Sequence, residues 1–238
     1  MDIAVIGDGK MGELILKVAK NQGIKVVGVV GQKTCSLGSP YELKTLPNCI
    51  VDFSAPILTK LAIDFCYQHK IPLVVGTTGL DDQIIQKIKD LSTIVPVIYS
   101  SNFSIGVAVL KKLLTVALNL LDGFDIELTE KHHAQKKDAP SGTAKEIMEC
   151  IKDARPNTQF VFGRQNEQQR QNAQVGVFSL RGGSVVGEHT VEFFGDGEEV
   201  AILHKATDRQ IFAEGAIMVA KKIWQMPCGL YELKDFVC

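Results

Sequence analysis

Residues 3–12 read Ile3-Ala4-Val5-Ile6-Gly7-Asp8-Gly9-Lys10-Met11-Gly12, a short apolar run that passes directly into glycines spaced G-x-G-x-x-G. Apolar residues then recur at helical spacing over residues 11–21. A strand, a glycine turn and a helix in this order are typical of a dinucleotide-binding domain, although the motif alone also occurs as an ordinary turn. We predict that the cofactor contacts Gly7, Asp8, Gly9, Lys10, Met11 and Gly12, with the pyrophosphate at the positive end of the helix.

Strand and helix patterns keep alternating after this turn. Most of the strand-like runs are continuously apolar, which fits strands that are covered on both faces. Such alternation predicts a parallel sheet joined by right-handed crossovers. The predicted strands are residues 3–6, 26–30, 50–53, 73–75 and 95–99, and the predicted helices are 11–21, 56–69 and 80–91.

The pattern changes near residue 102. A long helix is predicted over 105–121, and the strand-like stretches that follow partly alternate, which suggests a sheet with one open face. Residues 163–174 are polar and are interpreted as a long loop, and a final helix over 209–223 is expected to pack back on the first domain. The strands predicted in this region are 125–129, 176–180, 190–194 and 200–204. The fold class is therefore α/β, a Rossmann-type parallel sheet domain followed by an α+β domain.

Small polar residues follow two of the predicted strands, and in open parallel sheets the ligand lies beyond the carboxyl ends of the strands. The usual acid after the second strand is missing, because the sequence there is Val30-Gly31-Gln32-Lys33. A 2′-phosphate is then not repelled, and Lys33 either pairs with it or is an ordinary solvated loop lysine. The further cofactor-binding residues that we predict are Lys33, Gly76, Thr77, Thr78, Ser100, Ser101, Asn102 and Phe103.

The densest set of reactive side chains lies in residues 130–144. His132 and His133 suit proton transfer near neutral pH, and Lys136 offers a positive charge to a carboxylate. Ser141-Gly142-Thr143 precedes a predicted helix, whose first N–H groups form an anion receptor. Each feature alone is more often a structural histidine, a solvated lysine or a simple cap, but their combination indicates a site. A metal site is disfavoured, because adjacent residues of a strand point to opposite faces.

These residues resemble the dihydrodipicolinate reductase family, also called 4-hydroxy-tetrahydrodipicolinate reductase. The resemblance covers nearly the whole chain, and its most specific part is Glu130-x-His132-His133-x-x-Lys136-x-Asp138-Ala139-Pro140-Ser141-Gly142-Thr143-Ala144. It continues through Ser179-Leu180-Arg181, Gly187-Glu188-His189-Thr190 and His204-Lys205-Ala206.

The resemblance implies that NADPH or NADH reduces the small dicarboxylate 4-hydroxy-tetrahydrodipicolinate to tetrahydrodipicolinate, in diaminopimelate and lysine biosynthesis. It implies a nucleotide-binding domain of residues 1–104 and 209–238, and a substrate-binding and oligomerisation domain of residues 105–208. His132 would donate or accept a proton, and Lys136 would be a second proton donor or charge partner. The substrate carboxylates would be held by His133, Ser141, Gly142 and Thr143. Family members are commonly homotetramers.

Composition excludes several other classes of protein. The net charge of −1 and pI near 6.5 leave no general basic field for nucleic acid or an anionic membrane. No apolar stretch reaches the roughly 20 residues of a spanning helix, no signal peptide is evident, and the six cysteines form no Cys-x-x-Cys pair. We therefore expect a cytoplasmic protein with reduced thiols. One alternative is another Rossmann oxidoreductase of amino-acid metabolism, such as a semialdehyde or homoserine dehydrogenase-like protein, although no cysteine has the context that a semialdehyde dehydrogenase needs. The other is a non-catalytic dinucleotide sensor.

Overall fold

Six parallel strands form the first sheet of the computed structural model, which describes residues 1–33, 35–165 and 169–237. The strand order is β11-β5-β4-β3-β1-β2, and every neighbouring pair is parallel. The strands are β1 (Asp2–Ile6), β2 (Lys25–Val30), β3 (Cys49–Asp52), β4 (Leu73–Val75), β5 (Pro96–Tyr99) and β11 (Gly229–Tyr231). Residues 3–6 of β1, an interior strand between β3 and β2, are fully buried, as expected for a strand covered on both faces.

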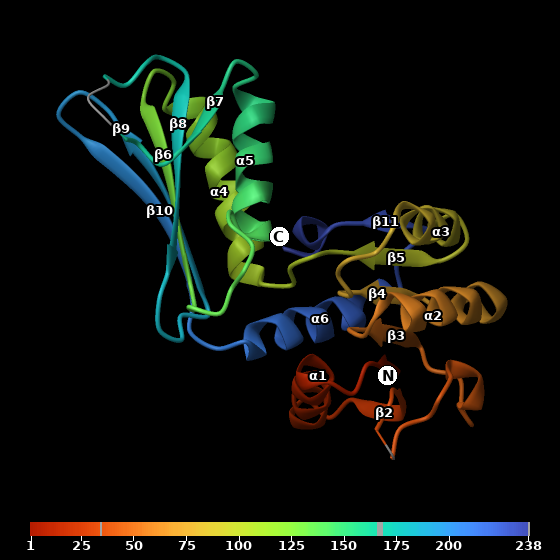
Figure 1. Ribbon diagram of the computed structural model, residues 1–238. Coiled ribbons are helices and arrows are strands. Elements are labelled where there is room, and N and C mark those ends of the chain that lie inside the picture. The colour runs from red at the N-terminus through yellow and green to blue at the C-terminus, as the bar shows by residue number, and fades with distance from the viewer. Residues whose placement is uncertain (34, 166–168, 238) are drawn as a thin grey trace. The chain divides into compact units, whose positions relative to one another are not determined.

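Four helices accompany this sheet: α1 (Lys10–Asn21), α2 (Pro56–His69), α3 (Asp82–Ser92) and α6 (Gln210–Ile223). Helices α1 and α6 contact each other, and α2 contacts α3, so the helices form two pairs (Figure 1). Local signals set where helices begin. Pro56 occupies the first turn of α2, and the Asp81 carboxylate caps α3 by accepting a hydrogen bond from the Ile84 N–H at 2.8 Å.

The second sheet is mixed and has the order β10-β9-β6-β8-β7. Strand β6 pairs in parallel with β8 and antiparallel with β9. Helices α4 and α5 lie against one face of this sheet (Figure 1), where their apolar side chains share one core with β6, β8 and β9. The elements are α4 (Ile105–Leu120), β6 (Asp125–His132), α5 (Gly142–Ala154), β7 (Gln159–Phe162), β8 (Gln174–Arg181), β9 (Gly187–Phe194) and β10 (Glu199–Ala206).

The chain divides into two units. The first unit comprises Met1–Ile105 and Gln210–Cys238, and the second comprises Gly106–Arg209. The second unit is therefore an insertion between β5 and α6, because both of its ends continue into the first unit. Within the described residues, no helix has the length and apolar character needed to cross a membrane.

The predicted fold class is confirmed, and the differences from the predicted elements are local. Strand β6 continues beyond the predicted end at residue 129 and includes His132 as its last residue. Two short strands, β7 and β11, were not predicted. The predicted loop over 163–174 ends one residue early, because Gln174 begins β8, and its residues 166–168 lie outside the described part of the chain.

Candidate active site

The glycine turn between β1 and α1 has the geometry that its sequence predicts. Gly7 has a φ of +108°, and a Cβ at this position would lie 2.2 Å from the Phe53 carbonyl oxygen. A Cβ on Gly12 would lie 1.9 Å from the Gly7 oxygen, so helix and turn pack too closely for any side chain. Around Gly9, by contrast, the space is open, and this residue, which directly precedes α1, has no side chain to cap the helix. The exposed N–H groups of α1 are thus available to a pyrophosphate, and the turn fits a dinucleotide.

A buried carboxylate organises the ends of β3 and β4 on the same edge of the sheet. Asp52, the last residue of β3, is fully buried and accepts hydrogen bonds from Ser54 Oγ at 2.5 Å, Thr59 Oγ1 at 2.6 Å and Thr77 Oγ1 at 3.0 Å. Burial raises the pKa of Asp52, and the hydroxyl donors oppose that shift. Thr77 also accepts a hydrogen bond from the Ser54 N–H at 2.8 Å. The Asp52 carboxylate therefore fixes the loop after β3 to the predicted cofactor residue Thr77.

The other predicted cofactor residues also lie in loops that follow strands of the first sheet. Gly76 and Thr78 flank Thr77 beyond β4, and residues 100–103 follow β5. The Phe103 side chain is buried, and its ring centroid lies 5.2 Å from that of Phe53. The Ser100 hydroxyl donates to the Asn102 carbonyl at 2.7 Å, which closes a tight turn. Since parallel strands place their carboxyl ends on one edge, the structure gathers these residues around the edge that carries the glycine turn.

The second unit carries a buried ion pair beside the predicted catalytic histidine. The Glu130 side chain has no exposed surface and binds Arg181 through two bonds, Nη1 to Oε2 at 2.8 Å and Nη2 to Oε1 at 2.7 Å. His132 Nδ1 lies 2.6 Å from Glu130 Oε2, and the Ser141 N–H donates to Oε1 at 3.1 Å. Glu130 therefore connects three segments: the end of β6, the end of β8 and the start of α5.

The charges of this group determine which ring nitrogen of His132 carries its proton. Burial raises the pKa of Glu130, but hydrogen bonds from Arg181 and His132 outweigh that effect and bring the pKa to about 2. Glu130 is thus ionised and accepts, so His132 Nδ1 carries the hydrogen and Nε2 is the nitrogen that exchanges a proton. Burial lowers the pKa of His132, while Glu130 raises it and the charges of Lys136 and Arg181 lower it.

A second histidine lies against the same group. The ring centroids of His132 and His189 are 5.2 Å apart in an edge-to-face arrangement. His189 is buried, and burial together with the charge of His132 lowers its pKa to about 4. His189 Nε2 lies 2.9 Å from Ser141 Oγ, and this oxygen also caps α5 by accepting from the Ala144 N–H at 3.2 Å. His189 is therefore neutral at physiological pH and holds the cap at the start of α5.

The remaining predicted substrate residues surround this group. Lys136 lies in the loop after β6, and its Nζ is 2.9 Å from Asp138 Oδ1. Gly142 and Thr143 form the first turn of α5, and His133 directly follows β6. An imidazole, an ammonium and a helix N-terminus thus lie within one short stretch of the second unit. No group of three His, Cys, Asp or Glu side chains in the described residues could hold a metal ion.

Three residues of this group were given no role in the sequence analysis: Glu130, Arg181 and His189. A signal for them exists in the alternation of the strands. Glu130 and His132 continue the inward face of Ile126 and Leu128. By the same rule Arg181 shares a face with Val177, and His189 shares one with Val191. Polar residues that continue a buried face require buried partners, which identifies them as candidates for a network.

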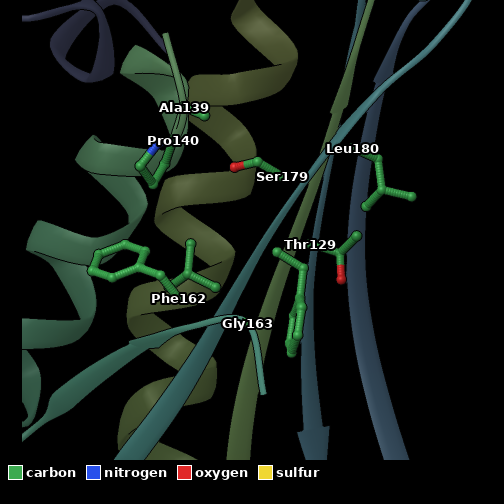
Figure 2. Close-up of a pocket in the computed structure, with 9 residues that line it drawn as sticks. Thr129, Ala139, Pro140, Phe162, Gly163, Ser179 and Leu180 are labelled. Carbon is green, nitrogen blue, oxygen red and sulfur yellow. The ribbon is translucent and has the colours of Figure 1, made fainter. Parts of the chain in front are cut away.

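A cavity of about 720 Å³ lies beside this network, at the edge where β7 ends and β8 continues. Figure 2 shows Ser179 directed toward Ala139 and Pro140, whereas Leu180, the next residue, points to the other side of the strand. Ser179 is the β8 partner of Glu130 in the sheet register, and its hydroxyl helps to lower the pKa of Glu130. None of the predicted substrate residues lines this cavity.

The sequence matches known proteins along nearly its full length. Residues 1–103 match the family described as dihydrodipicolinate reductase, N-terminus, and residues 106–237 match dihydrodipicolinate reductase, C-terminus. This chain belongs to the dihydrodipicolinate reductase family. It is therefore an oxidoreductase, as the resemblance of its motifs predicted.

Relatives in this family share the whole length of the chain. The chain is 39% identical to the 4-hydroxy-tetrahydrodipicolinate reductase of Staphylococcus epidermidis over 99% of this chain and 100% of the relative. It is also 39% identical to the Staphylococcus aureus JH9 protein of the same name, over 97% and 98% of the two chains.

Solved structures share the fold. A dipicolinate-bound dihydrodipicolinate reductase from Paenisporosarcina sp. TG-14 has a TM-score of 0.79 at 24% identity and covers 99% of this chain and 98% of its own. A DAP dehydrogenase of C. glutamicum in complex with DAP has a TM-score of 0.58 at 11% identity, over 99% and 93% of the chains. The two-unit architecture of this reductase chain thus also occurs in a dehydrogenase of low sequence similarity.

Proposed function

We propose that this chain reduces 4-hydroxy-tetrahydrodipicolinate to tetrahydrodipicolinate, with NADPH or NADH as the reductant, in diaminopimelate and lysine biosynthesis. The observation that carries the proposal is the Glu130–His132 pair beside the N-terminus of α5, because it combines a proton donor with an anion receptor. The names of the relatives agree with this reaction.

The first unit would hold the dinucleotide. Gly7, Asp8, Gly9, Lys10, Met11 and Gly12 would bind the pyrophosphate through the turn and the start of α1. The residues that follow β4 and β5, namely Gly76, Thr77, Thr78, Ser100, Ser101, Asn102 and Phe103, would contact the nicotinamide half. When bound, the reduced nicotinamide supplies the hydride.

The second unit would hold the two substrate carboxylates. Gly142 and Thr143 present the first N–H groups of α5, which favour an anion. Ser141 is bonded to His189 and Glu130, so it would fix the position of this helix start rather than move with the ligand. His133 and the Lys136 ammonium would complete the anion site, with the substrate competing with Asp138 for Lys136.

His132 would deliver the proton that the ring needs. The substrate loses its hydroxyl as water, hydride adds to the ring carbon conjugated with the imine, and a proton must reach the neighbouring carbon. His132 Nε2 can give this proton, because Glu130 holds the hydrogen on Nδ1 and stabilises the imidazolium form. Lys136 would stabilise the negative charge that develops as hydride arrives. The proton that His132 donates is replaced from water after each turnover.

A direct assay tests the proposal. Freshly prepared substrate is mixed with the purified protein and NADPH or NADH, and the nicotinamide absorbance is followed. We expect oxidation that depends on substrate, a strong loss of turnover in His132→Gln and Lys136→Ala, and unchanged dinucleotide binding in both variants. Turnover equal to the unmodified protein in either variant would remove that residue from the mechanism. Absence of any oxidation would contradict the proposed reaction.

The finer expectations on assembly and location belong to the same proposal. Within the described residues of the second unit, α4 and α5 cover one face of the second sheet, and its other face carries side chains such as Leu180 and Leu203, which are about half exposed. This face suits the sheet association of a homotetramer, which size-exclusion chromatography with light scattering would test. A cytoplasmic location follows from the biosynthetic role, and cell fractionation would test it.

A further inference from the structure

The first sheet lacks an acid at the position that usually selects the cofactor. In dinucleotide-binding domains an Asp or Glu near the end of the second strand accepts a hydrogen bond from the ribose 2′-hydroxyl. Here β2 ends at Val30, and the next residue is Gly31, which has no side chain. Residue 31 therefore offers no side chain to contact the ribose 2′ group, and another segment would have to supply that contact.

Asp8, which belongs to the glycine turn, places its carboxylate beside Gly31, where the usual acid would lie. Its Oδ2 accepts the Lys33 N–H at 2.6 Å and the Ser36 hydroxyl at 2.9 Å, so it is bound to the loop that follows β2. A Cβ built on Gly31 would lie 2.1 Å from Asp8 Oδ2. The carboxylate thus stands where a side chain of residue 31 would begin, and Gly31 is the residue type that leaves room for it.

The charges around Asp8 leave the region after β2 negative. The Lys33 N–H, together with the Ser36 hydroxyl, holds the pKa of Asp8 below its usual value although desolvation opposes the shift, so the carboxylate is ionised. The Lys33 ammonium is paired with the Glu13 carboxylate. Two carboxylates and one ammonium therefore border the loop after β2. Lys33 donates its backbone N–H to Asp8, whereas its ammonium is bound to Glu13.

We propose that the Asp8 carboxylate contacts the ribose 2′ group of the dinucleotide and that this contact favours binding of NADH over NADPH. This inference rests on the proposed function, because it needs a dinucleotide in the turn between β1 and α1. An ionised carboxylate accepts a hydrogen bond from a 2′-hydroxyl and repels a 2′-phosphate. The proposal replaces the sequence-based hypothesis that Lys33 holds a 2′-phosphate.

Measurements of equilibrium binding test this proposal without depending on catalytic turnover. Dissociation constants of NADH and NADPH are measured by calorimetry for the unmodified protein, Asp8→Asn and Asp2→Asn. The asparagine introduced by Asp8→Asn has the shape of aspartate and keeps an oxygen for the Lys33 N–H but has no charge. Asp2 lies at the opposite end of β1, where it pairs with Lys25, so its variant makes the same charge change far from the turn.

We expect NADH to bind the unmodified protein more tightly, and Asp8→Asn to shift the affinity ratio toward NADPH by about tenfold, the scale of one like-charge contact near a surface. Asp2→Asn should leave the ratio unchanged. Lys33→Ala, which keeps the backbone N–H, should not weaken NADPH selectively. A ratio that stays the same in Asp8→Asn, or a selective loss of NADPH in Lys33→Ala, would overturn the proposal.

Salt dependence of the unmodified protein gives a second measurement that needs no variant. If a carboxylate repels the 2′-phosphate, raising the salt concentration should screen the repulsion and shift the affinity ratio toward NADPH. A shift in the other direction would show attraction at the 2′ position and would refute the inference, even if Asp8→Asn failed to fold. Binding of neither nucleotide would instead refute the proposed function, and this inference with it.

Discussion

Replacement of Glu130 by glutamine removes one negative charge from the buried group beside His132. The amide keeps the shape of the carboxylate and can still accept one hydrogen bond, but it cannot stabilise an imidazolium through its charge. The charged and titratable groups that face His132 would then be Arg181 from β8, Lys136 from the following loop and His189 from β9. The first two of these lower the pKa of His132.

The expected size of the effect follows from the hydrogen bond between His132 Nδ1 and Glu130 Oε2, which measures 2.6 Å. A hydrogen bond to a charged group contributes about 1.5–3 kcal/mol, which corresponds to about 10- to 150-fold in rate. The sign is set by the proton balance. Burial already lowers the pKa of His132 and Glu130 opposes this, so in Glu130→Gln the pKa falls further and less imidazolium is present at a given pH. The loss of turnover should therefore grow as the pH rises and shrink as it falls.

The assay is kcat/KM for the substrate as a function of pH, together with the ¹⁵N spectrum of the His132 ring. The matched control is Glu188→Gln, because Glu188 pairs with Lys131 on the opposite face of the same sheet. The control should keep the profile of the unmodified protein. In Glu130→Gln the alkaline limb should move to lower pH, and the ring proton should no longer reside on Nδ1 alone.

Folding must be separated from chemistry in this test, because removing one partner of a buried pair costs about 3–5 kcal/mol. The double variant Glu130→Gln/Arg181→Met removes both charges and avoids a buried guanidinium without a partner. It should regain much of the stability but not the turnover. An unchanged pH profile and an unchanged ring spectrum in a folded Glu130→Gln protein would refute the role of this carboxylate.

Further predictions concern stability and the glycine turn. The pKa of Glu130 is about 2 in the folded protein against its ordinary 4.5, so its contribution to stability is present above pH 4.5 and is lost as the pH falls toward 2. The free energy of unfolding in urea should therefore fall less between pH 4.5 and 2 in Glu130→Gln than in the unmodified chain. Ser141→Ala removes the cap of α5, so it should lower the free energy of unfolding in urea by about 0.5–2 kcal/mol and raise KM for the substrate. If the free energy of unfolding and KM both equal those of the unmodified protein, the role of the cap is contradicted. Gly12→Ala should abolish dinucleotide binding in calorimetry, because the new Cβ would lie 1.9 Å from the Gly7 oxygen.

The first sheet could be predicted because its signals are local. The strand of residues 3–6 and the helices of residues 10–21 and 56–69 are each set by their own apolar pattern, glycines and prolines. Strand β11 has three residues and exists because it pairs with β5, more than a hundred residues earlier in the chain. No local pattern carries that information. The same holds for β7, whose four residues gain their strand geometry from pairing with β8.

The candidate site divides in the same way. His132, Lys136 and the Ser141–Thr143 stretch lie within a dozen residues, so their proximity follows from the sequence. The ion pair of Glu130 with Arg181 joins residues 51 positions apart, and the contact of Ser141 with His189 joins residues 48 apart. Both contacts depend on the register of β6 against β8 and β9, which sequence alone does not reveal. The direction of the Asp8 side chain likewise depends on the loop after β2.

The order of elements along the chain has a consequence for biosynthesis on the ribosome. Helix α6 and strand β11 are made last, yet α6 packs on α1, the first helix, and β11 closes the edge of the sheet beside β5. The first unit therefore stays incomplete, with the surface that α6 later covers exposed to water, until the entire inserted unit has been translated. A chaperone that binds apolar surface could bind this exposed region. The elements of the inserted unit are contiguous in sequence, so this unit can fold before the first unit is complete.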